Sequence, residues 1–289
     1  MRPRPIFGLT LLAFATLGQA QERIQDVIYT KHDGVALTFD VFKPAHPNGI
    51  GVIFVVSGGW VSSHAAISEP VAKTMTDKGI TVFEVVHGTQ PRFLVQEIVF
   101  DISRAVRYIR TNADKFGIQP NKIGIYGGSA GGHLSLMAAA LGGDGNPTAP
   151  DPVDRTSSAL NAVGAFFPPT DFQNFGKPGL NVFDNPMLRV LSPAFGVNDK
   201  TPRDKVVDLE KKLSPITYVS AKFPPTYVIQ GDKDILVPEQ QAHVFTDALK
   251  AAGVNTTLII VPGAGHDPNL LVQKPGHDLA DWFVKTLGG

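Results

Sequence analysis

Short apolar runs alternate along this chain with longer segments in which apolar residues recur at helical spacing. The apolar runs cover residues 50–56, 80–86, 122–126, 162–167, 226–230 and 257–261. The helical segments cover residues 66–78, 96–115, 131–141, 238–252 and 275–287. Strands without a polar side must be covered on both faces, and their alternation with helices is typical of a mostly parallel sheet. The sequence therefore predicts an α/β fold.

Two segments depart from this alternation. Asp33-Gly34 separates two apolar-rich stretches near the start, and this pair favours a tight turn between antiparallel strands. Residues 168–225 are rich in Pro, Asn and Asp and contain one charged helical segment, 203–213. Because this region has no core pattern of its own, we expect a lid-like insertion within one domain, residues 21–289.

The first twenty residues have the pattern of a secretory signal peptide. Arg2 and Arg4 precede an apolar run, and Gly18-Gln19-Ala20 supplies small residues for cleavage after Ala20. The apolar run is well short of the ~20 residues that span a bilayer. We therefore expect residues 1–20 to be removed and the protein to be periplasmic or secreted, without a stable membrane anchor.

Charge and cysteine content exclude several classes of function. The 26 basic residues equal the 26 acidic ones, which gives no indication of a nucleic-acid partner. The chain has no cysteine, so disulfides, a thiolate nucleophile and thiolate metal sites are all excluded. An exported domain of this kind must be stabilised by core packing.

A glycine-rich motif, GGSAGG, joins the strand "KIGIY" to the helical "LSLMAAA". Within it, Gly127, Ser129 and Gly131 form G-x-S-x-G, which between a strand and a helix is a nucleophile elbow. The alternative is a phosphate-binding turn, but its G-x-G-x-x-G or G-K-[ST] pattern is absent here. The motif predicts an exposed serine hydroxyl at the carboxyl end of the sheet.

The serine needs a base and an acid, and both follow later strands. "VIQGDKDILVP" places Asp232 and Asp234 after one strand, and "VPGAGHDPN" places His266 after the next. Chain order Ser, acid, His is the order of a triad on this kind of sheet. Asp234 is favoured over Asp232, because Asp232 directly follows the strand and is expected to hold the turn.

Two other histidines lie near these motifs. His133 directly follows the elbow glycines and is expected to pack within the helix, with a direct role as the lesser alternative. His87-Gly88 resembles an oxyanion loop but follows the wrong strand for one, and a role of His87 in the substrate pocket is the lesser alternative.

Longer stretches around these residues resemble a known family. They are "DISRAVRYIRTNADKFGIQPNKIGIYGGSAGGHLS", "FPPTDF", "LSPITYVSAKFPPTYVIQGDKDILVP" and "GAGH". Together they resemble the α/β-hydrolase superfamily, in the esterase and lipase branch related to hormone-sensitive lipase and acetyl esterases. The resemblance covers residues 50 to 285 and implies an α/β-hydrolase fold. It assigns the triad to Ser129, Asp234 and His266, and one oxyanion donor to the amide of Ala130.

The resemblance also gives a role to the stretch "VVSGGW". In this branch the corresponding loop carries a histidine followed by glycines, whose N–H groups complete the oxyanion hole. Here Val56 or Ser57 stands in place of the histidine that normally supports the loop. Gly58 and Gly59 are the expected donors, with Trp60 as the alternative.

We therefore expect an exported serine hydrolase that cleaves carboxylic esters through an acyl-enzyme. Its expected substrate is a short-chain ester or a small acetylated carbohydrate, and no metal or organic cofactor is required. A peptidase or amidase is the main alternative, because relatives on this fold use the same triad. A non-catalytic binding protein is the other.

Overall fold

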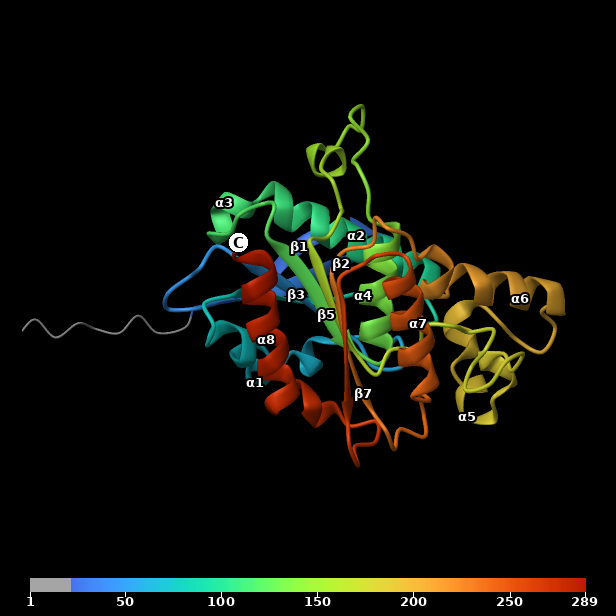
Figure 1. The fold of residues 1–289 in the computed structure, drawn as a ribbon. Helices are drawn as coiled ribbons and strands as arrows, with labels where there is room; N and C mark the ends of the chain where they lie inside the picture. Colours follow the sequence, from blue (N-terminus) through green and yellow to red (C-terminus); the bar gives the residue numbers. More distant parts are fainter. Residues whose placement is uncertain (1–21) are drawn as a thin grey trace, which may run out of the picture.

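A computed structural model describes residues 22–289, and its centre is an eight-stranded sheet in the order β1-β2-β4-β3-β5-β6-β7-β8 (Figure 1). The strands are β1 (Glu22–His32), β2 (Val35–Lys43), β3 (Gly51–Val56), β4 (Thr81–Val86), β5 (Ile123–Gly128), β6 (Ala162–Phe166), β7 (Thr226–Gly231) and β8 (Thr256–Val261). The predicted signal peptide, residues 1–20, lies outside the described residues.

The sheet is antiparallel only at its β1–β2 end. β1 pairs with β2 and β2 with β4 in antiparallel register, and all later neighbours are parallel. The turn between β1 and β2 places Asp33 at φ 49° and Gly34 at φ 72°. Two adjacent positive φ angles make the tight hairpin turn for which Asp-Gly is suited, so the predicted hairpin is confirmed.

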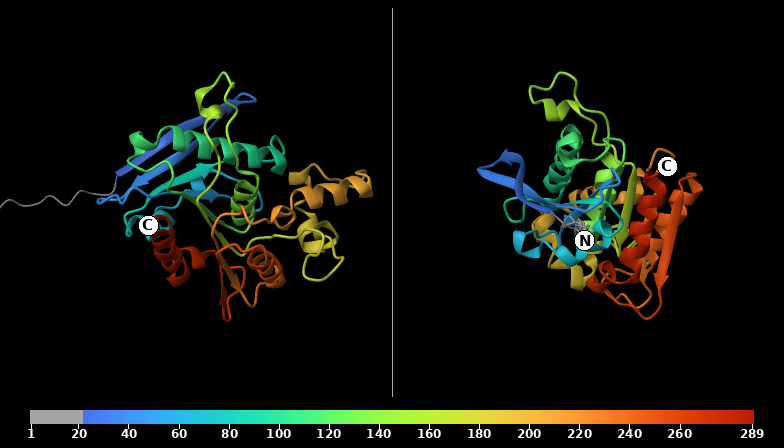
Figure 2. Two further views of the ribbon diagram at one scale, coloured as in Figure 1. Left: turned by 45° about the horizontal axis from the view of Figure 1, so that its top comes forward. Right: turned by 90° about the vertical axis from the view of Figure 1, so that its left-hand side faces the viewer.

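Helices cover both faces of the sheet (Figures 1 and 2). They are α1 (Glu69–Thr76), α2 (Val95–Thr111), α3 (Ala113–Phe116), α4 (Ala130–Leu141), α7 (Gln240–Ala251) and α8 (Lys274–Leu287). α1 and α8 pack on one face, and α2, α4 and α7 on the other. Along β3 the buried side chains alternate between these two layers, Val52 and Phe54 facing one and Ile53 and Val55 the other. The predicted α/β-hydrolase architecture is therefore present.

The long helix predicted over residues 96–115 is interrupted. α2 ends at Thr111 and α3 begins at Ala113, because Asn112 has a non-helical backbone at φ −107° and ψ 22°. The side-chain amide of Asn112 donates to the Tyr108 carbonyl at 2.8 Å. Asparagine competes in this way with the helical hydrogen bonds, which the apolar spacing alone does not indicate.

The segment from 168 to 225 contains α5 (Pro186–Arg189), α6 (Arg203–Lys212) and the 3₁₀ turns η3 (Val182–Asp184), η4 (Ser192–Phe195) and η5 (Pro215–Tyr218). Figures 1 and 2 show α5 and α6 on the outer side of the layer that holds α4 and α7. Phe172, Phe195 and Leu213 belong to the same apolar cluster as α2 and α4. The segment thus shares the main core, and its function as a lid stays a prediction. No helix within residues 22–289 is long and apolar enough to cross a membrane.

Candidate active site

Ser129 occupies a sharp turn between β5 and α4, with φ 53° and ψ −119°. A positive φ is strained for a residue with a side chain, and such strain is characteristic of functional turns. A Cβ added at Gly127 would lie 2.5 Å from the carbonyl carbon of Gly131, and one added at Gly131 would lie 2.6 Å from the Val55 carbonyl oxygen. Both positions therefore require glycine. The backbone of the predicted elbow is present, with Ser129 where β5 ends.

His266 and Asp234 meet Ser129 from two later loops. His266 follows β8, and its Nε2 lies 2.9 Å from Oγ of Ser129. Nδ1 of His266 lies 2.7 Å from Oδ2 of Asp234, which follows β7. An ionised carboxylate only accepts, so Nδ1 carries the proton and Nε2 is free to accept one from the serine. The three residues form one hydrogen-bonded chain.

The carboxyl group of Asp234 is fully buried and held by four donors. Oδ1 accepts from the amides of Leu236 and Val237, both at 2.9 Å, and Oδ2 accepts from Nε2 of Gln230 at 3.1 Å as well as from His266. Burial alone would raise the pKa of Asp234, but the hydrogen bonds from His266 and from the Val237 amide outweigh it and hold the pKa below its ordinary value. The carboxylate therefore stays ionised beside the imidazole.

Asp232 has a different environment. Its Oδ1 accepts from the Gly263 amide at 2.7 Å, which links the loops that follow β7 and β8. It therefore contacts the turn, whereas Asp234 contacts His266.

The loop after β3 forms a tight turn beside the elbow. The amide of Gly58 donates to the Val61 carbonyl, and the Val61 amide to the Gly58 carbonyl, each at 3.0 Å. Gly59 and Trp60, between them, have φ angles of 56° and 60°. In the described part of the chain, the amides of Gly59, Trp60 and Ala130 have no protein acceptor, so Trp60 remains the alternative donor. The geometry thus favours Gly59 over Gly58 as a donor, because the N–H of Gly58 is already used within the turn.

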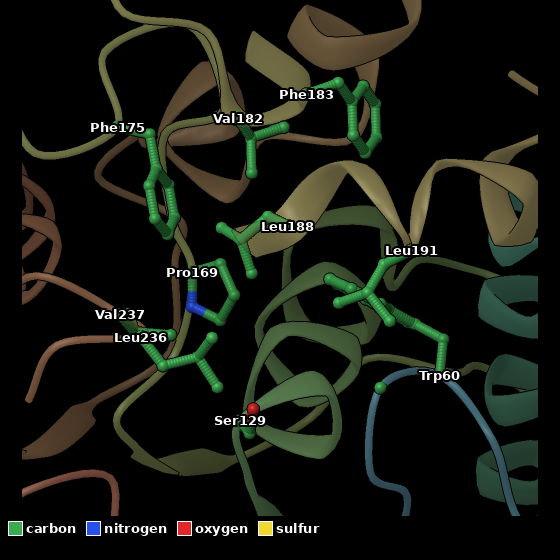
Figure 3. A pocket seen from close by; sticks show the side chains of 11 residues that line it. Trp60, Ser129, Pro169, Phe175, Val182, Phe183, Leu188, Leu191, Leu236 and Val237 are labelled. Atoms are coloured by element: carbon green, nitrogen blue, oxygen red, sulfur yellow. The ribbon is translucent and has the colours of Figure 1, made fainter. Parts of the chain in front are cut away.

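Two pockets adjoin Ser129. The enclosed pocket has a volume of about 60 Å³ and is lined mainly by apolar side chains, among them Trp60, Phe175, Phe183, Leu188, Leu191 and Leu236. Figure 3 shows these side chains around a space above Oγ of Ser129, with Phe183 at its far end. The open pocket has a volume of about 310 Å³ and is lined by His266, Ser57, Phe54, Phe167, Pro268 and Leu271, besides glycines and Leu236.

His87 and His133, the two histidines near the sequence motifs, line neither pocket. His87 is buried, and burial lowers its pKa to about 4, against a hydrogen bond to the Gly88 carbonyl that raises it. His133 is buried in α4, where its Nδ1 accepts from Nε1 of Trp60 at 3.1 Å. Sequence reasoning placed His133 in helix packing but did not connect it to Trp60. No group of His, Asp or Glu side chains among residues 22–289 has the arrangement of a metal site.

A mostly parallel eight-stranded sheet, an elbow after its central strand β5 and a Ser–His–Asp chain at its carboxyl end define an α/β hydrolase of the esterase and lipase branch. Within that branch the chain belongs to the BD-FAE family, whose model matches residues 39–249.

Relatives with described activities are similar over most of this chain. Esterase LipC of Mycobacterium tuberculosis is 29% identical over 245 residues, which are 83% of this chain and 59% of LipC. The chain spans between 44% and 59% of the length of three mycobacterial relatives that it matches.

Two solved structures are similar over nearly the whole length of both chains. A truncated form of a carbohydrate esterase from gut microbiota has 25% identity and a TM-score of 0.80, over 95% of this chain and 99% of that one. The butyrate-bound structure of Est2, a thermophilic esterase of Thermogutta terrifontis, has 26% identity and a TM-score of 0.70, over 94% and 95% of the two chains.

Proposed function

We propose that this chain is an exported serine esterase that hydrolyses carboxylic esters through an acyl-enzyme. The observation that carries the proposal is the continuous chain of hydrogen bonds from Ser129 through His266 to Asp234, with distances of 2.9 and 2.7 Å. A serine hydroxyl becomes a nucleophile when an oriented base takes its proton. The esterase relatives support the same chemistry.

Acylation begins when Oγ of Ser129 attacks the ester carbonyl carbon. Nε2 of His266 takes the hydroxyl proton, and Asp234 stabilises the imidazolium through Nδ1. Negative charge then develops on the carbonyl oxygen. We expect the amides of Ala130 and Gly59 to donate to it, because one begins α4 and the other lies in the adjacent turn.

Collapse of this intermediate breaks the bond to the alcohol. The proton on Nε2 of His266 passes to the leaving alkoxide oxygen, so the alcohol departs neutral and the acyl group stays on Ser129. Water then attacks the acyl carbon, gives one proton to His266, and releases the carboxylic acid when that proton returns to Oγ of Ser129.

The two pockets suit different parts of an ester. The leaving oxygen must lie beside Nε2 of His266, so the alcohol belongs in the open pocket that His266 lines. The acyl chain then enters the enclosed pocket. A water needs about 10–15 Å³ of such space, so about 60 Å³ holds only a few atoms. The difference in volume between the two pockets supports a substrate with a short acyl group and a larger alcohol.

The names of two similar structures support this substrate class. One is a carbohydrate esterase, and the other holds butyrate, a short acyl product. We therefore propose a short-chain or acetylated carbohydrate ester as substrate class. The arginine-led apolar segment of residues 1–20 supports export.

The direct test is a series of p-nitrophenyl esters from acetyl to octanoyl. We expect the highest kcat/KM with the shortest chains and no turnover by the Ser129→Ala variant. Full activity in Ser129→Ala would overturn the proposed mechanism. A preference for long chains would overturn the assignment of the enclosed pocket.

Two comparisons narrow the substrate. An ester and an amide of the same acyl group separate an esterase from a peptidase or amidase, and we expect the ester alone to be turned over rapidly. Acetylated and feruloylated sugars then test the alcohol and acyl sides separately, with acetyl release expected to be faster. Export is tested by whether the mature protein begins at Gln21 after expression with its full N-terminus.

A further inference from the structure

We infer that Trp60 and His133 form a strut that positions the oxyanion loop, residues 57–61, against the nucleophile helix α4. The inference rests on the proposed function for its effect on catalysis. It makes both residues positioning residues, acting through the amides of Gly59 and Ala130.

The backbone hydrogen bonds between Gly58 and Val61 close the turn of the loop, but they do not attach it to α4. Gly59 and Trp60 both have positive φ angles, and for tryptophan this backbone conformation is unfavourable. The hydroxyl of Ser57 is buried and makes no hydrogen bond within residues 22–289. The Ser57 side chain therefore does not support the turn through a hydrogen bond. The attachment of the turn to α4 must therefore come from another side chain.

Trp60 provides one half of the support. Its side chain is 4% exposed although it comes from a surface turn. Nε1 donates to Nδ1 of His133 at 3.1 Å. The indole also meets the rings of His133 and Phe195 edge-on, with centroids 5.5 and 4.7 Å apart. These contacts fix the indole and hence the backbone of the turn.

His133 provides the other half. It is fully buried, and its Nε2 lies 2.7 Å from the Leu213 carbonyl, which can only accept. Nε2 therefore carries the proton and Nδ1 is the acceptor that Trp60 requires. The imidazole also stacks on Phe172, with centroids 5.1 Å apart and planes at 15°.

The strut joins the two parts of the proposed oxyanion hole. Gly59 directly precedes Trp60, and Ala130 begins the same helix that carries His133. Leu213 follows α6 in the insertion, so the strut also connects the hole to that segment. Removing either partner leaves the other with a buried polar atom unpaired, which favours displacement of the loop.

Four variants test the strut. Trp60→Phe keeps an aromatic ring but removes the donor, and His133→Leu removes both hydrogen bonds. His133→Gln can accept from Trp60 and donate to Leu213. Trp282→Phe is the matched control, because Trp282 lies on α8 and packs against Tyr227 and Phe283 on the other face of the sheet.

With p-nitrophenyl acetate, we expect kcat to fall in Trp60→Phe and His133→Leu with little change in KM. Losing an oxyanion donor costs about 10²–10³-fold in kcat, so a displaced donor should cost roughly 10- to 100-fold. His133→Gln should recover most of kcat, and Trp282→Phe should match the wild type. Equal losses in His133→Gln and His133→Leu, or wild-type kcat in Trp60→Phe, would overturn the inference.

Hydrogen exchange of the amides of residues 58–61 tests the strut without any substrate. We expect faster exchange in Trp60→Phe and His133→Leu than in the wild type, and wild-type exchange in Trp282→Phe. Unchanged exchange in both strut variants would refute the strut. A wild type that exchanges as expected but hydrolyses no ester would instead refute the proposed function. If Trp60→Phe does not fold, His133→Gln and His133→Leu are compared instead, both in kcat and in the hydrogen exchange of residues 58–61.

Discussion

Nδ1 of His266 lies 2.7 Å from Oδ2 of Asp234, whereas the carboxylate of Asp232, two residues earlier, accepts from the Gly263 amide. The two aspartates therefore have different roles within one short loop. Asp234 can fix the tautomer of the imidazole, and Asp232 can only hold the turn. This difference gives a matched pair of variants.

Asp234→Asn should lower kcat by about 10⁴-fold, because an amide does not enforce the tautomer that leaves Nε2 free. Asp232→Asn should keep near-wild-type kcat, since an asparagine oxygen can still accept from Gly263. Steady-state kinetics with p-nitrophenyl acetate measures both. Comparable losses in the two variants would contradict the assignment of the acid.

Alanine substitutions at Gly59 and Gly58 give a second matched pair of variants. An alanine at position 59 must adopt φ 56°, which costs about 1–2 kcal/mol. At position 58 an added Cβ has no atom within 4 Å. We expect Gly59→Ala to lose stability and kcat together, and Gly58→Ala to retain both. Urea unfolding and kinetics test this, and the reverse order of effects would show that the turn is wrongly described.

The enclosed pocket predicts how acyl preference can be changed. Leu191 lines it, whereas the neighbouring Val190 is 74% exposed and points away. Leu191→Ala should shift preference toward longer acyl chains by about fourfold in relative kcat/KM for each added methylene, the equivalent of about 0.8 kcal/mol. Val190→Ala is the control. An unchanged chain-length profile in Leu191→Ala would mean that the acyl group lies elsewhere.

His133 predicts a pH dependence of stability. Burial lowers its pKa from 6.5 to about 4, despite the hydrogen bond with Leu213, which raises it. The unfolded chain therefore binds a proton below pH 6.5 that the folded protein takes up only near pH 4. Its stabilising contribution is complete above the higher pKa and is lost as pH falls toward the lower one, by at most about 3 kcal/mol.

The comparison with His133→Gln isolates this contribution, because the other titrating groups are common to both proteins. The free energy of unfolding of the wild type minus that of the variant should fall on acidification between the two pKa values. Urea titrations at several pH values measure it. A difference independent of pH would mean that His133 is not kept neutral by the fold.

The sheet and the elbow were predictable because their signals are local. Apolar runs without polar alternation predict buried parallel strands, and β3 and β5 match residues 50–56 and 122–126 closely. Gly127 and Gly131 are required because a side chain at either position would clash with the adjoining backbone. The glycines of the motif therefore indicate the tight turn directly. The positions of Asp234 and His266 follow because the ends of parallel strands share one edge of the sheet.

The remaining features depend on contacts between distant segments. Trp60 and His133 are 73 residues apart, and their contact depends on a turn with two positive φ angles that no local pattern specifies. The same turn occupies the amide of Gly58, which sequence reasoning had counted as a donor. The apolar residues of the insertion indicate burial, but not that Leu188 and Leu191 face Ser129.

The central claim is that Ser129 carries the acyl group during ester hydrolysis. Rapid acid quenching of the protein with an acetyl ester, followed by digestion and mass spectrometry, tests it most directly. We predict acetylation of the peptide that contains Ser129, formed within one turnover and absent in Ser129→Ala. Ester turnover without acetyl on that peptide, or unchanged turnover in Ser129→Ala, would contradict the claim.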